Sequence, residues 1–122
     1  MRVLVTGATG FFGPEIVSRL RAAGHDVAGA SRHSGPDPGS VALDIVSPDS
    51  CARAFEAAGP VDAVVHAAVF AHVKPSPDVA VECRTVNAGG TANVVEAAAS
   101  CGVSHFVFIS SIMVYGDYDL PL

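Results

Sequence analysis

Short apolar segments alternate along the chain with longer segments in which apolar residues recur at helical spacing. A strand buried inside a sheet has a short, nearly continuous apolar sequence. Segments of that kind predict five strands, at residues 2–6, 26–31, 41–43, 61–66 and 105–109. Helical spacing predicts three helices between them, at about residues 12–23, 48–58 and 77–100. Strands that alternate with helices form a parallel α/β sheet, with right-handed crossovers.

Residues that begin or end helices support these limits. Pro14 fits a first helical turn, where its missing N–H has no partner to lose, and Gly24 fits a C-terminal cap. Ser47 is predicted to cap the second helix at its N-terminus, and Gly59 followed by Pro60 is predicted to end it. Loops are predicted for the stretches in between and for the last residues, at 33–40, 70–77 and 112–122.

A loop with glycine at every third position follows the first predicted strand. Without a Cβ, Gly7, Gly10 and Gly13 allow backbone N–H groups to approach a phosphate closely. The loop leads directly into a helix, which is the setting of a dinucleotide-binding turn, although a tight turn that binds nothing is the alternative. The Phe12 side chain is also expected to continue the apolar face of that helix. The residues predicted to contact the cofactor here are Gly7, Thr9, Gly10, Phe11, Phe12 and Gly13.

Composition narrows the classes of function. The 122 residues suit one domain, and with 50% hydrophobic and 16% charged residues disorder is not expected. A net charge of −5 argues against a nucleic acid as partner, although a local glycine loop can still bind an anion. The three cysteines are scattered without metal-ligand spacing, so we expect no metal site and a cytoplasmic location. Because no apolar run approaches the ~20 residues of a membrane-spanning helix, we expect no membrane partner.

Three motifs resemble those of the short-chain dehydrogenase/reductase superfamily, particularly its extended branch of NAD-dependent epimerase/dehydratase-like proteins. Residues 6–13, TGATGFFG, are similar to the TGxxGxxG turn, residues 87–93 match NxxGTxN, and residues 110–116, SSIMVYG, resemble SSxxVYG. The resemblance runs from residue 2 to at least residue 116, but it covers only the N-terminal half of the family's usual length. It implies one NAD(P)-binding domain over residues 1–122. The implied fold is a Rossmann-type doubly wound sheet in strand order 3-2-1-4-5, truncated before the later strands.

The end of the second predicted strand indicates which dinucleotide is bound. In a dinucleotide-binding fold this point faces the adenosine ribose, where an acidic residue bonds the 2′-hydroxyl and an arginine pairs with a 2′-phosphate. Ser31 stands where NAD-preferring relatives usually have aspartate, and Arg32 follows it. We therefore predict NADP as the cofactor. NAD is the alternative, if Arg32 is only a solvated residue at a strand end.

The resemblance implies further cofactor contacts at the ends of the third and fourth strands. Asp44 would accept a hydrogen bond from the adenine amino group beside Ile45, and an Asx turn is the alternative role for this aspartate. The backbone at His66, Ala67 and Ala68 would line the ribose and the pyrophosphate. A lone histidine at a strand end is more often held by hydrogen bonds than catalytic, so the His66 side chain is a weak catalytic candidate.

The other two motifs imply residues at the reacting end of the cofactor. The family assigns Asn87 to organising the site near the nicotinamide, and helix packing is the alternative for the polar group of Asn87, Gly90, Thr91 and Asn93. Ser111 is the implied catalytic residue, which hydrogen-bonds the reacting hydroxyl or carbonyl oxygen. Ser110 beside it is expected to contact the cofactor.

The family's catalytic YxxxK pair is absent from these 122 residues. In the family, that tyrosine is the general acid/base, and the nearby lysine lowers its pKa. Tyr115 lies too close to Ser111 to be this tyrosine, and the single lysine, Lys74, precedes the serine in a predicted loop. We therefore expect a fragment of a longer enzyme that is inactive alone.

Two functions are compatible with the sequence. The first is the NAD(P)-binding part of an epimerase, dehydratase or carbonyl reductase that transfers hydride to or from a small-molecule substrate, a secondary alcohol or ketone such as a nucleotide sugar. The second is a non-enzymatic dinucleotide-binding sensor or interaction domain. The fifth strand would be an exposed edge in this fold, which is an association hazard, and a homodimer could cover it.

Overall fold

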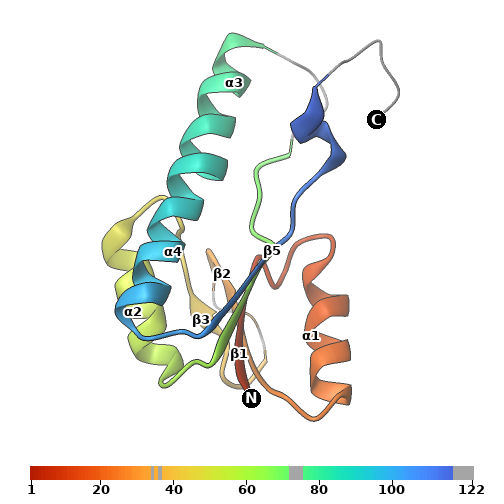
Figure 1. The fold of residues 1–122 in the computed structure, drawn as a ribbon, viewed down its shortest axis with the longest axis vertical. Coiled ribbons are helices and arrows are strands. Elements are labelled where there is room, and N and C mark those ends of the chain that lie inside the picture. Colours follow the sequence, from red (N-terminus) through yellow and green to blue (C-terminus); the bar gives the residue numbers. More distant parts are fainter. Residues whose placement is uncertain (34, 36, 72–75, 117–122) are drawn as a thin grey trace.

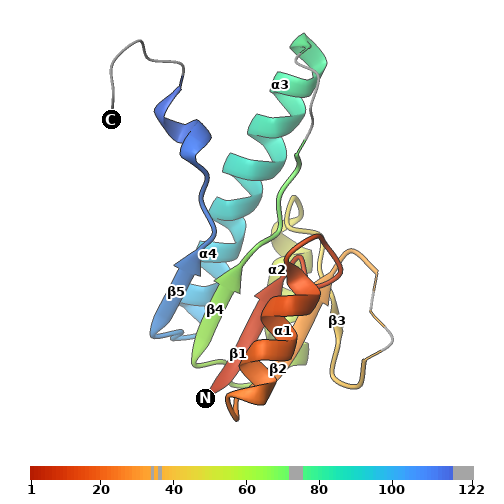
Figure 2. The ribbon, with the colours of Figure 1, turned by 90° about the vertical axis from the view of Figure 1, so that its right-hand side faces the viewer.

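A parallel sheet of five strands is the centre of the computed structural model, which describes residues 1–33, 35, 37–71 and 76–116. The strand order is β3-β2-β1-β4-β5, as predicted, and every pairing is parallel. Figure 2 shows the strands side by side, with β5 at one edge. The strands are β1 (Arg2–Thr6), β2 (Asp26–Ser31), β3 (Val41–Ala42), β4 (Ala63–His66) and β5 (His105–Phe108).

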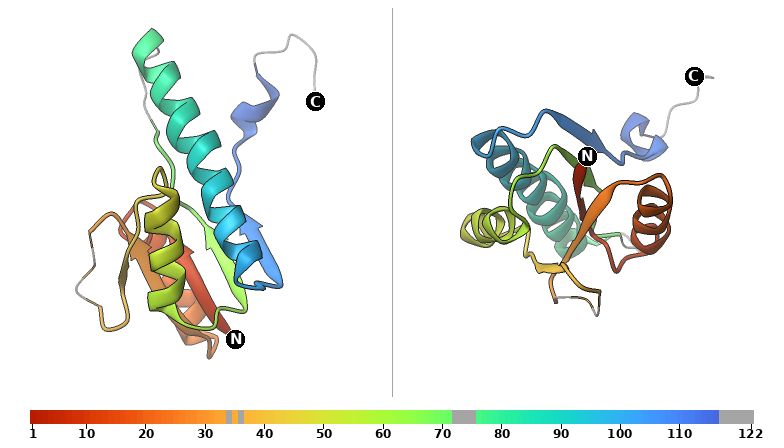
Figure 3. Two further views of the ribbon diagram at one scale, coloured as in Figure 1. Left: turned by 90° about the vertical axis from the view of Figure 1, so that its left-hand side faces the viewer. Right: turned by 90° about the horizontal axis from the view of Figure 1, so that it is seen from below.

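Helices cover both faces of the sheet. Helix α1 (Gly13–Ala22) packs on one face, whereas α2 (Pro48–Ala58) and α4 (Thr91–Ser100) pack on the other (Figure 3, right). Helix α3 (Pro77–Cys83), the π-helix η1 (Arg84–Gly90) and α4 follow one another without a break, and together they rise beyond the carboxyl end of the sheet (Figure 1). This arrangement is the doubly wound architecture that the alternation of strands and helices predicted.

The expected helix over residues 77–100 is present, but it is not α-helical throughout, because its middle is the π-helix η1. A π turn accommodates an extra residue and is frequently found at functional sites. Within it, Gly90 packs so closely on Ile45 that an added Cβ would lie 2.7 Å from the Ile45 Cδ1 atom. The Asn87 side chain meanwhile bonds the backbone of Phe70. Both contacts come from the π-helical segment.

The last described residues also differ from the expected loop. Residues 112–115 form a short 3-10 helix, η2 (Ile112–Tyr115), closed at its start by a hydrogen bond from the Val114 N–H to the Ser111 carbonyl at 3.2 Å. This stretch contains neither glycine nor proline within the turn, so nothing in it opposes a single helical turn. The predicted loop residues 117–122 lie outside the described residues.

The predicted helix ends are confirmed by their local geometry. The Ser47 hydroxyl accepts a hydrogen bond from the Ser50 N–H at 3.2 Å and so caps α2, and Pro14 lies in the first turn of α1. Gly24 and Gly59 follow α1 and α2 with φ of +86° and +74°, the left-handed conformation that glycine adopts without strain.

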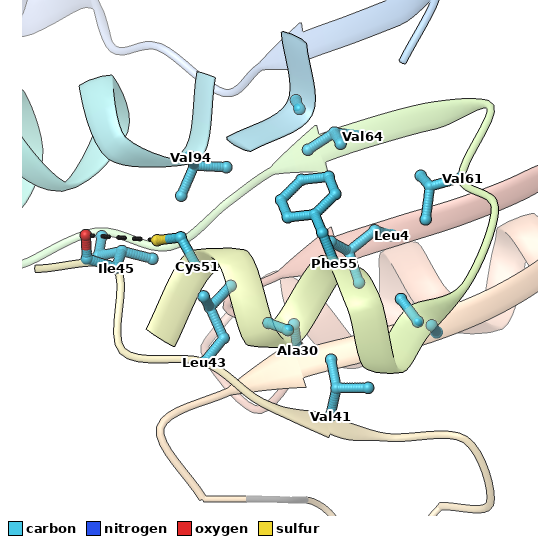
Figure 4. Close-up of a cluster of buried hydrophobic side chains, with 14 residues drawn as sticks. Leu4, Ala30, Val41, Leu43, Ile45, Cys51, Phe55, Val61, Val64 and Val94 are labelled. Atoms are coloured by element: carbon cyan, nitrogen blue, oxygen red, sulfur yellow. Dashed lines mark hydrogen bonds between the residues drawn. The ribbon is translucent and has the colours of Figure 1, made fainter. Parts of the chain in front are cut away.

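The larger hydrophobic cluster lies between the sheet and the pair α2 and α4. Figure 4 shows Phe55 of α2 pointing at Leu4 and Val64 of the central strands, with Val94 of α4 nearby. Cys51 is fully buried in the same cluster. Burial and the nearby Asp44 carboxylate raise the pKa of Cys51 to about 11, so its thiol stays protonated and acts in packing.

A smaller cluster lies under α1 on the opposite face. Val3 and Val5 of β1 contribute to it, whereas Leu4 between them faces the larger cluster. Successive residues of a strand point to opposite faces, so a strand buried on both faces must be apolar throughout. This explains why residues 3–5 show no alternation with polar residues.

The outer strand β5 is much less covered than the centre of the sheet, as expected. Val107, Phe108 and Ile109 are all exposed. Only β4 pairs with β5 in the described part of the chain, so its other edge presents unpaired backbone among apolar side chains.

We expect Phe55→Ala to lower the free energy of unfolding by about 3–5 kcal/mol, because it removes a fully buried ring and leaves a cavity between α2 and the sheet. Urea denaturation followed by circular dichroism measures this loss. The neighbouring exposed residue gives the control, Glu56→Ala, which should change stability by less than about 0.5 kcal/mol. Equal stabilities of the two variants would contradict the assignment of Phe55 to the core.

Candidate functional site

A cleft of about 810 Å³ opens at the carboxyl end of the strands, where parallel α/β sheets hold their ligands. A second hollow, of about 540 Å³, lies beside α1 and shares only Thr9 and Ser31 with the cleft. The concentration of predicted site residues in the larger cleft makes it the candidate site. The predicted residues that line it are Gly7, Thr9, Gly10, Phe11, Phe12, Ser31, Arg32, Asp44, Ile45, Ala67 and Ala68.

The glycine loop is compressed against its neighbours in a way that requires glycine. Gly7 has φ of +69°, and a Cβ there would lie 2.7 Å from the Ala68 nitrogen and 2.8 Å from the Ala67 carbonyl carbon. Gly13 does not line the cleft, but a Cβ on it would lie 2.2 Å from the Gly7 carbonyl oxygen. The Gly10 N–H donates to that same oxygen at 2.9 Å. The three glycines therefore fold the loop onto itself and onto the end of β4.

The N-terminus of α1 follows this loop directly and has no side-chain cap. Phe12 occupies the capping position, where it cannot supply a hydrogen-bond acceptor from its side chain. The uncapped N–H groups and the helix dipole make this end suitable for an anion.

The structure corrects the expected role of the Phe12 side chain. Phe12 does not continue the apolar face of α1, because it precedes the helix and its ring is 59% exposed. Its ring instead packs edge to face against Phe11, which is 93% exposed, with centroids 4.9 Å apart. Both rings stand at the open cleft.

The arginine that directly follows β2 brings a positive charge to the cleft. The Ser31 hydroxyl donates a short hydrogen bond to the His33 carbonyl, which turns the chain immediately after the strand. Arg32 is exposed, lines the cleft, and makes no ion pair with the other residues that the structure describes. Among the described residues that line the cleft it is the one basic side chain, so it is placed to meet a negative group.

The loop after β3 forms another wall. The Asp44 carboxylate accepts a hydrogen bond from the Val46 N–H at 3.1 Å, which is the Asx turn considered as its alternative role. Ile45 is buried, and the Asn93 amide donates to the Ile45 and Val46 carbonyls at 2.9 Å and 3.2 Å. Helix α4 therefore fixes this wall through a side chain that does not itself line the cleft.

His66 lies behind the cleft, whereas Ala67 and Ala68 line it. Its carbonyl accepts from the Ile109 N–H at 3.1 Å, and its side chain is 1% exposed. The structure thus leaves His66 out of the cleft lining, and its backbone is still paired within the sheet. The ring lies 2.7 Å from the Thr6 hydroxyl and 3.0 Å from the Thr91 hydroxyl. A side chain enclosed in this way is held in place and cannot reach a ligand.

Asn87 also lies outside the cleft lining, but it supports one wall. Its amide oxygen accepts from the Phe70 N–H at 2.7 Å, and its amide nitrogen donates to the Phe70 carbonyl at 2.9 Å. Phe70 itself lines the cleft. Both ends of the Asn87 amide thus bind one residue of the loop after β4, and Gly90 serves close packing on Ile45.

Ser110 and Ser111 follow β5 and are exposed, and neither lines the cleft. The structure therefore does not bring the predicted catalytic serine together with the cofactor residues in one pocket. Lys74, the single lysine of the sequence, lies outside the described residues.

Several lining residues were not predicted from the sequence. The loop after β4 contributes Val69, Phe70 and Ala71, and Glu82 and Val86 come from the long helix. The helical pair is spaced by four residues, which places both on one face. In the sequence, the one sign that Glu82 and Val86 line a site is that they lie close to Asn87. Only the fold shows that their side of the helix faces the cleft.

The described residues show neither a membrane-spanning helix nor a cluster of metal ligands. None of the helices there is long and apolar enough to cross a membrane. Within the same residues, no three or more histidine, cysteine, aspartate or glutamate side chains gather closely enough to hold a metal ion.

Comparison with known proteins gives consistent matches. The model of the NAD dependent epimerase/dehydratase family matches residues 3–121. The chain is 38% identical to L-arabinose 1-dehydrogenase (NAD(P)(+)) from Haloferax volcanii and 35% identical to 3 beta-hydroxysteroid dehydrogenase/Delta 5→4-isomerase from Mycobacterium tuberculosis. Each alignment covers 98% of this chain, but only 44% of the first relative and 36% of the second.

A solved structure agrees with these relatives. UDP-glucose 4-epimerase from Thermus thermophilus, in complex with NAD, superposes with a TM-score of 0.80 at 36% identity. The superposition covers 91% of this chain and 38% of the epimerase. The chain thus spans less than half the length of the relatives that it matches here.

Protonation of His66 should make stability depend on pH. Burial lowers the pKa of His66 below 6.5 in the folded state, whereas an unfolded histidine titrates near 6.5. Between these two values the unfolded state binds more protons, so we expect the free energy of unfolding to fall as the pH is lowered, by at most about 1.4 kcal/mol per pH unit. Below the folded pKa this loss stops growing.

Urea denaturation at several pH values between about 5 and 7.5 measures the effect, since that interval spans the ordinary histidine pKa. The readout is the difference between the wild type and His66→Asn, since other groups titrate in both. His33→Gln, which replaces an exposed histidine, is the matched control and should keep the wild-type dependence. A His66→Asn variant with the same pH dependence as the wild type would show that His66 is not the group responsible.

Proposed function

Because the chain belongs to the NAD dependent epimerase/dehydratase family, we propose that it is the NAD(P)-binding part of an extended short-chain dehydrogenase/reductase. The whole protein would transfer hydride to or from a secondary alcohol or ketone. The observation that carries the proposal is the glycine loop, which is pressed onto Ala67 and Ala68 and leads at the cleft into a helix N-terminus without a side-chain cap.

The glycine loop fits a dinucleotide pyrophosphate on its own geometry. Side chains at Gly7 and Gly13 would collide with backbone atoms, so the loop keeps its surface free of Cβ atoms at these positions. Backbone N–H groups at Phe11 and Phe12 lie where α1 begins and would donate to phosphate oxygens. Ala67 and Ala68 would line the opposite side, where small side chains allow the ligand to lie close.

The adenosine end of the ligand would lie along the ends of β2 and β3. We assign the 2′-phosphate of NADP to Arg32, because this guanidinium lines the cleft without a carboxylate partner in the described part of the chain. Asp44 and Ile45 would border the adenine, and Ser31 leaves space where an aspartate would repel a 2′-phosphate.

The chemistry divides between the cofactor and residues of the chain. A nicotinamide dinucleotide supplies or accepts the hydride when it is bound. Ser111 would hydrogen-bond the reacting oxygen, and Ser110 and Asn87 would support the nicotinamide end. The 122 residues contain no YxxxK pair to move the proton, so we propose that the chain alone binds cofactor without turning over a substrate.

The proposal also covers the cellular location of the protein, its oligomeric state and its substrates. The three cysteines are free, which supports a reducing, cytoplasmic location. For the chain by itself, the exposed β5 edge supports a homodimer that covers Val107 and Phe108. Nucleotide sugars are candidate substrates, because a relative of similar fold is a UDP-glucose 4-epimerase.

We expect the chain to bind NADPH. A fluorescence titration of NADPH into the folded chain should saturate, and a Gly13→Val variant should bind far more weakly, because its side chain would displace the Gly7 carbonyl. Circular dichroism checks that both proteins are folded. If the folded wild type binds neither NADPH nor NADH up to millimolar concentrations, the proposed function is wrong.

We expect Arg32→Ala to reduce the preference for NADPH over NADH by roughly ten- to a hundredfold. A charge-assisted contact with a phosphate contributes about 1.5–3 kcal/mol, and NADH offers no such group. The measurement is the ratio of the two Kd values in wild type and variant. Arg53→Ala, on the exposed side of α2, is the matched control and should leave the ratio unchanged. An unchanged ratio in Arg32→Ala would remove Arg32 from the assignment.

A further inference from the structure

A chain of hydrogen bonds runs through His66 and links three elements. The Ala68 N–H donates to the Thr6 hydroxyl oxygen at 3.2 Å, and that oxygen lies 2.7 Å from His66 Nδ1. On the other side of the ring, Nε2 lies 3.0 Å from the Thr91 hydroxyl oxygen. Thr6 is the last residue of β1, His66 is the last residue of β4, and Thr91 is the first residue of α4.

Either neutral tautomer satisfies both ring contacts while the Thr6 oxygen accepts from the Ala68 N–H, and the Nε2-protonated form shows how. A neutral imidazole has one N–H donor and one acceptor nitrogen. With the proton on Nε2, the ring donates to the Thr91 oxygen and accepts the Thr6 hydroxyl proton at Nδ1. Thr6 then both donates to the ring and accepts from the Ala68 N–H. The burial of His66 favours the neutral form that this arrangement needs.

The chain of bonds ends at two neighbouring segments of the cleft lining. Thr6 immediately precedes Gly7, and Ala68 is the residue whose nitrogen would be 2.7 Å from a Cβ on Gly7. Gly7 and Ala68 both line the cleft, but the His66 side chain does not. The imidazole therefore acts on the cleft only through the residues that it holds.

Aromatic rings restrict the imidazole further. The Phe108 ring is stacked on it with centroids 6.0 Å apart, and the Phe106 ring lies at 5.9 Å in a tilted arrangement. Packing by β5 thus leaves the imidazole little freedom to turn away from Thr6 and Thr91. The imidazole packs against two phenylalanine rings and is hydrogen-bonded at both nitrogens. It therefore forms a rigid link between the glycine loop and α4.

We propose that His66 is a positioning residue for the dinucleotide cleft, which couples the start of α4 to the spacing between Gly7 and Ala68 through its hydrogen bonds to Thr91 and Thr6. The proposal rests on the proposed function, because it concerns the geometry that a bound dinucleotide would need. In this proposal the His66 side chain supports binding without contacting the ligand. Thr91 belongs to the same hydrogen-bond chain and shares this role.

The test measures NADPH affinity in variants that cut the chain of bonds at different points. His66→Phe removes both bonds and should raise the Kd about tenfold. Thr91→Val removes only the bond to α4 and should raise it by roughly two- to fivefold, in the lower part of the range expected for one neutral hydrogen bond. His66→Asn keeps a polar atom near the position of Nδ1, so it should bind like Thr91→Val. Combining His66→Asn with Thr91→Val should add no further loss, because the two changes cut the same bond.

A control separates positioning from general stability. Val3→Ala removes a buried side chain at the opposite end of β1 from Thr6, so it should lower the free energy of unfolding while leaving the Kd for NADPH within about twofold of the wild type. Hydrogen exchange at the Ala68 amide gives a readout that needs no ligand. It should be faster in Thr91→Val than in Val3→Ala, although Thr91 acts on Ala68 only through His66 and Thr6.

The outcomes are distinct. If the wild type binds NADPH and Thr91→Val and His66→Asn bind with the same Kd as the wild type, the positioning role is wrong and the proposed function stands. If Val3→Ala weakens binding as much as these variants, their effect is one of stability and the inference is also wrong. If the folded wild type binds no dinucleotide, the proposed function fails and this inference fails with it. Should His66→Phe not fold, Thr91→Val and His66→Asn still decide between these outcomes.

Discussion

The close approach of the Gly7 backbone to the backbone of Ala67 and Ala68 is the constraint on which the rest of the site depends. A single Cβ on Gly7 would lie 2.7 Å from the Ala68 nitrogen, so the segments are as close as glycine alone allows. Gly13 packs in turn on the Gly7 carbonyl, and this sets where α1 begins. The direction of the first N–H groups of α1, and with it the side from which an anion can approach, follows from these two contacts.

The register of the sheet makes this approach possible. Thr6 is paired with Ala30 of β2 on one side and with His66 of β4 on the other, so the three strands end at one level. The residues that follow them therefore meet at one edge, and side chains buried on both faces of the sheet hold this register. The loop has a fixed geometry because it leaves the central strand, whereas Ser110 and Ser111 leave the edge strand β5 and lie outside the cleft.

The strands, their order and many of the residues that line the cleft could be predicted from the sequence, because each depends on local features: an apolar run, a glycine or a residue just after a strand. The features that were missed depend on contacts distant in sequence. The π-helix η1 appears where Gly90 packs on Ile45 and Asn87 bonds Phe70. The burial of His66 depends on Thr91, 25 residues away along the chain. Phe12 looked like a residue of the helical face because helical spacing does not show where the first turn begins.

The charges at the cleft explain why backbone groups must dominate binding of an anionic dinucleotide. The chain carries a net charge of −5, and the cleft is lined by Asp44 and Glu82 as well as by Arg32. The described side chains at the cleft therefore give no net positive charge to attract a pyrophosphate. The attraction must come from oriented N–H groups and from the dipole of α1, which act only over the first turn. Because such groups cannot move toward the ligand as a lysine side chain can, their alignment must be fixed beforehand. Buried residues next to the glycine loop can fix this alignment. Thr6 and His66, which lie 2.7 Å apart and are both buried, are in that position.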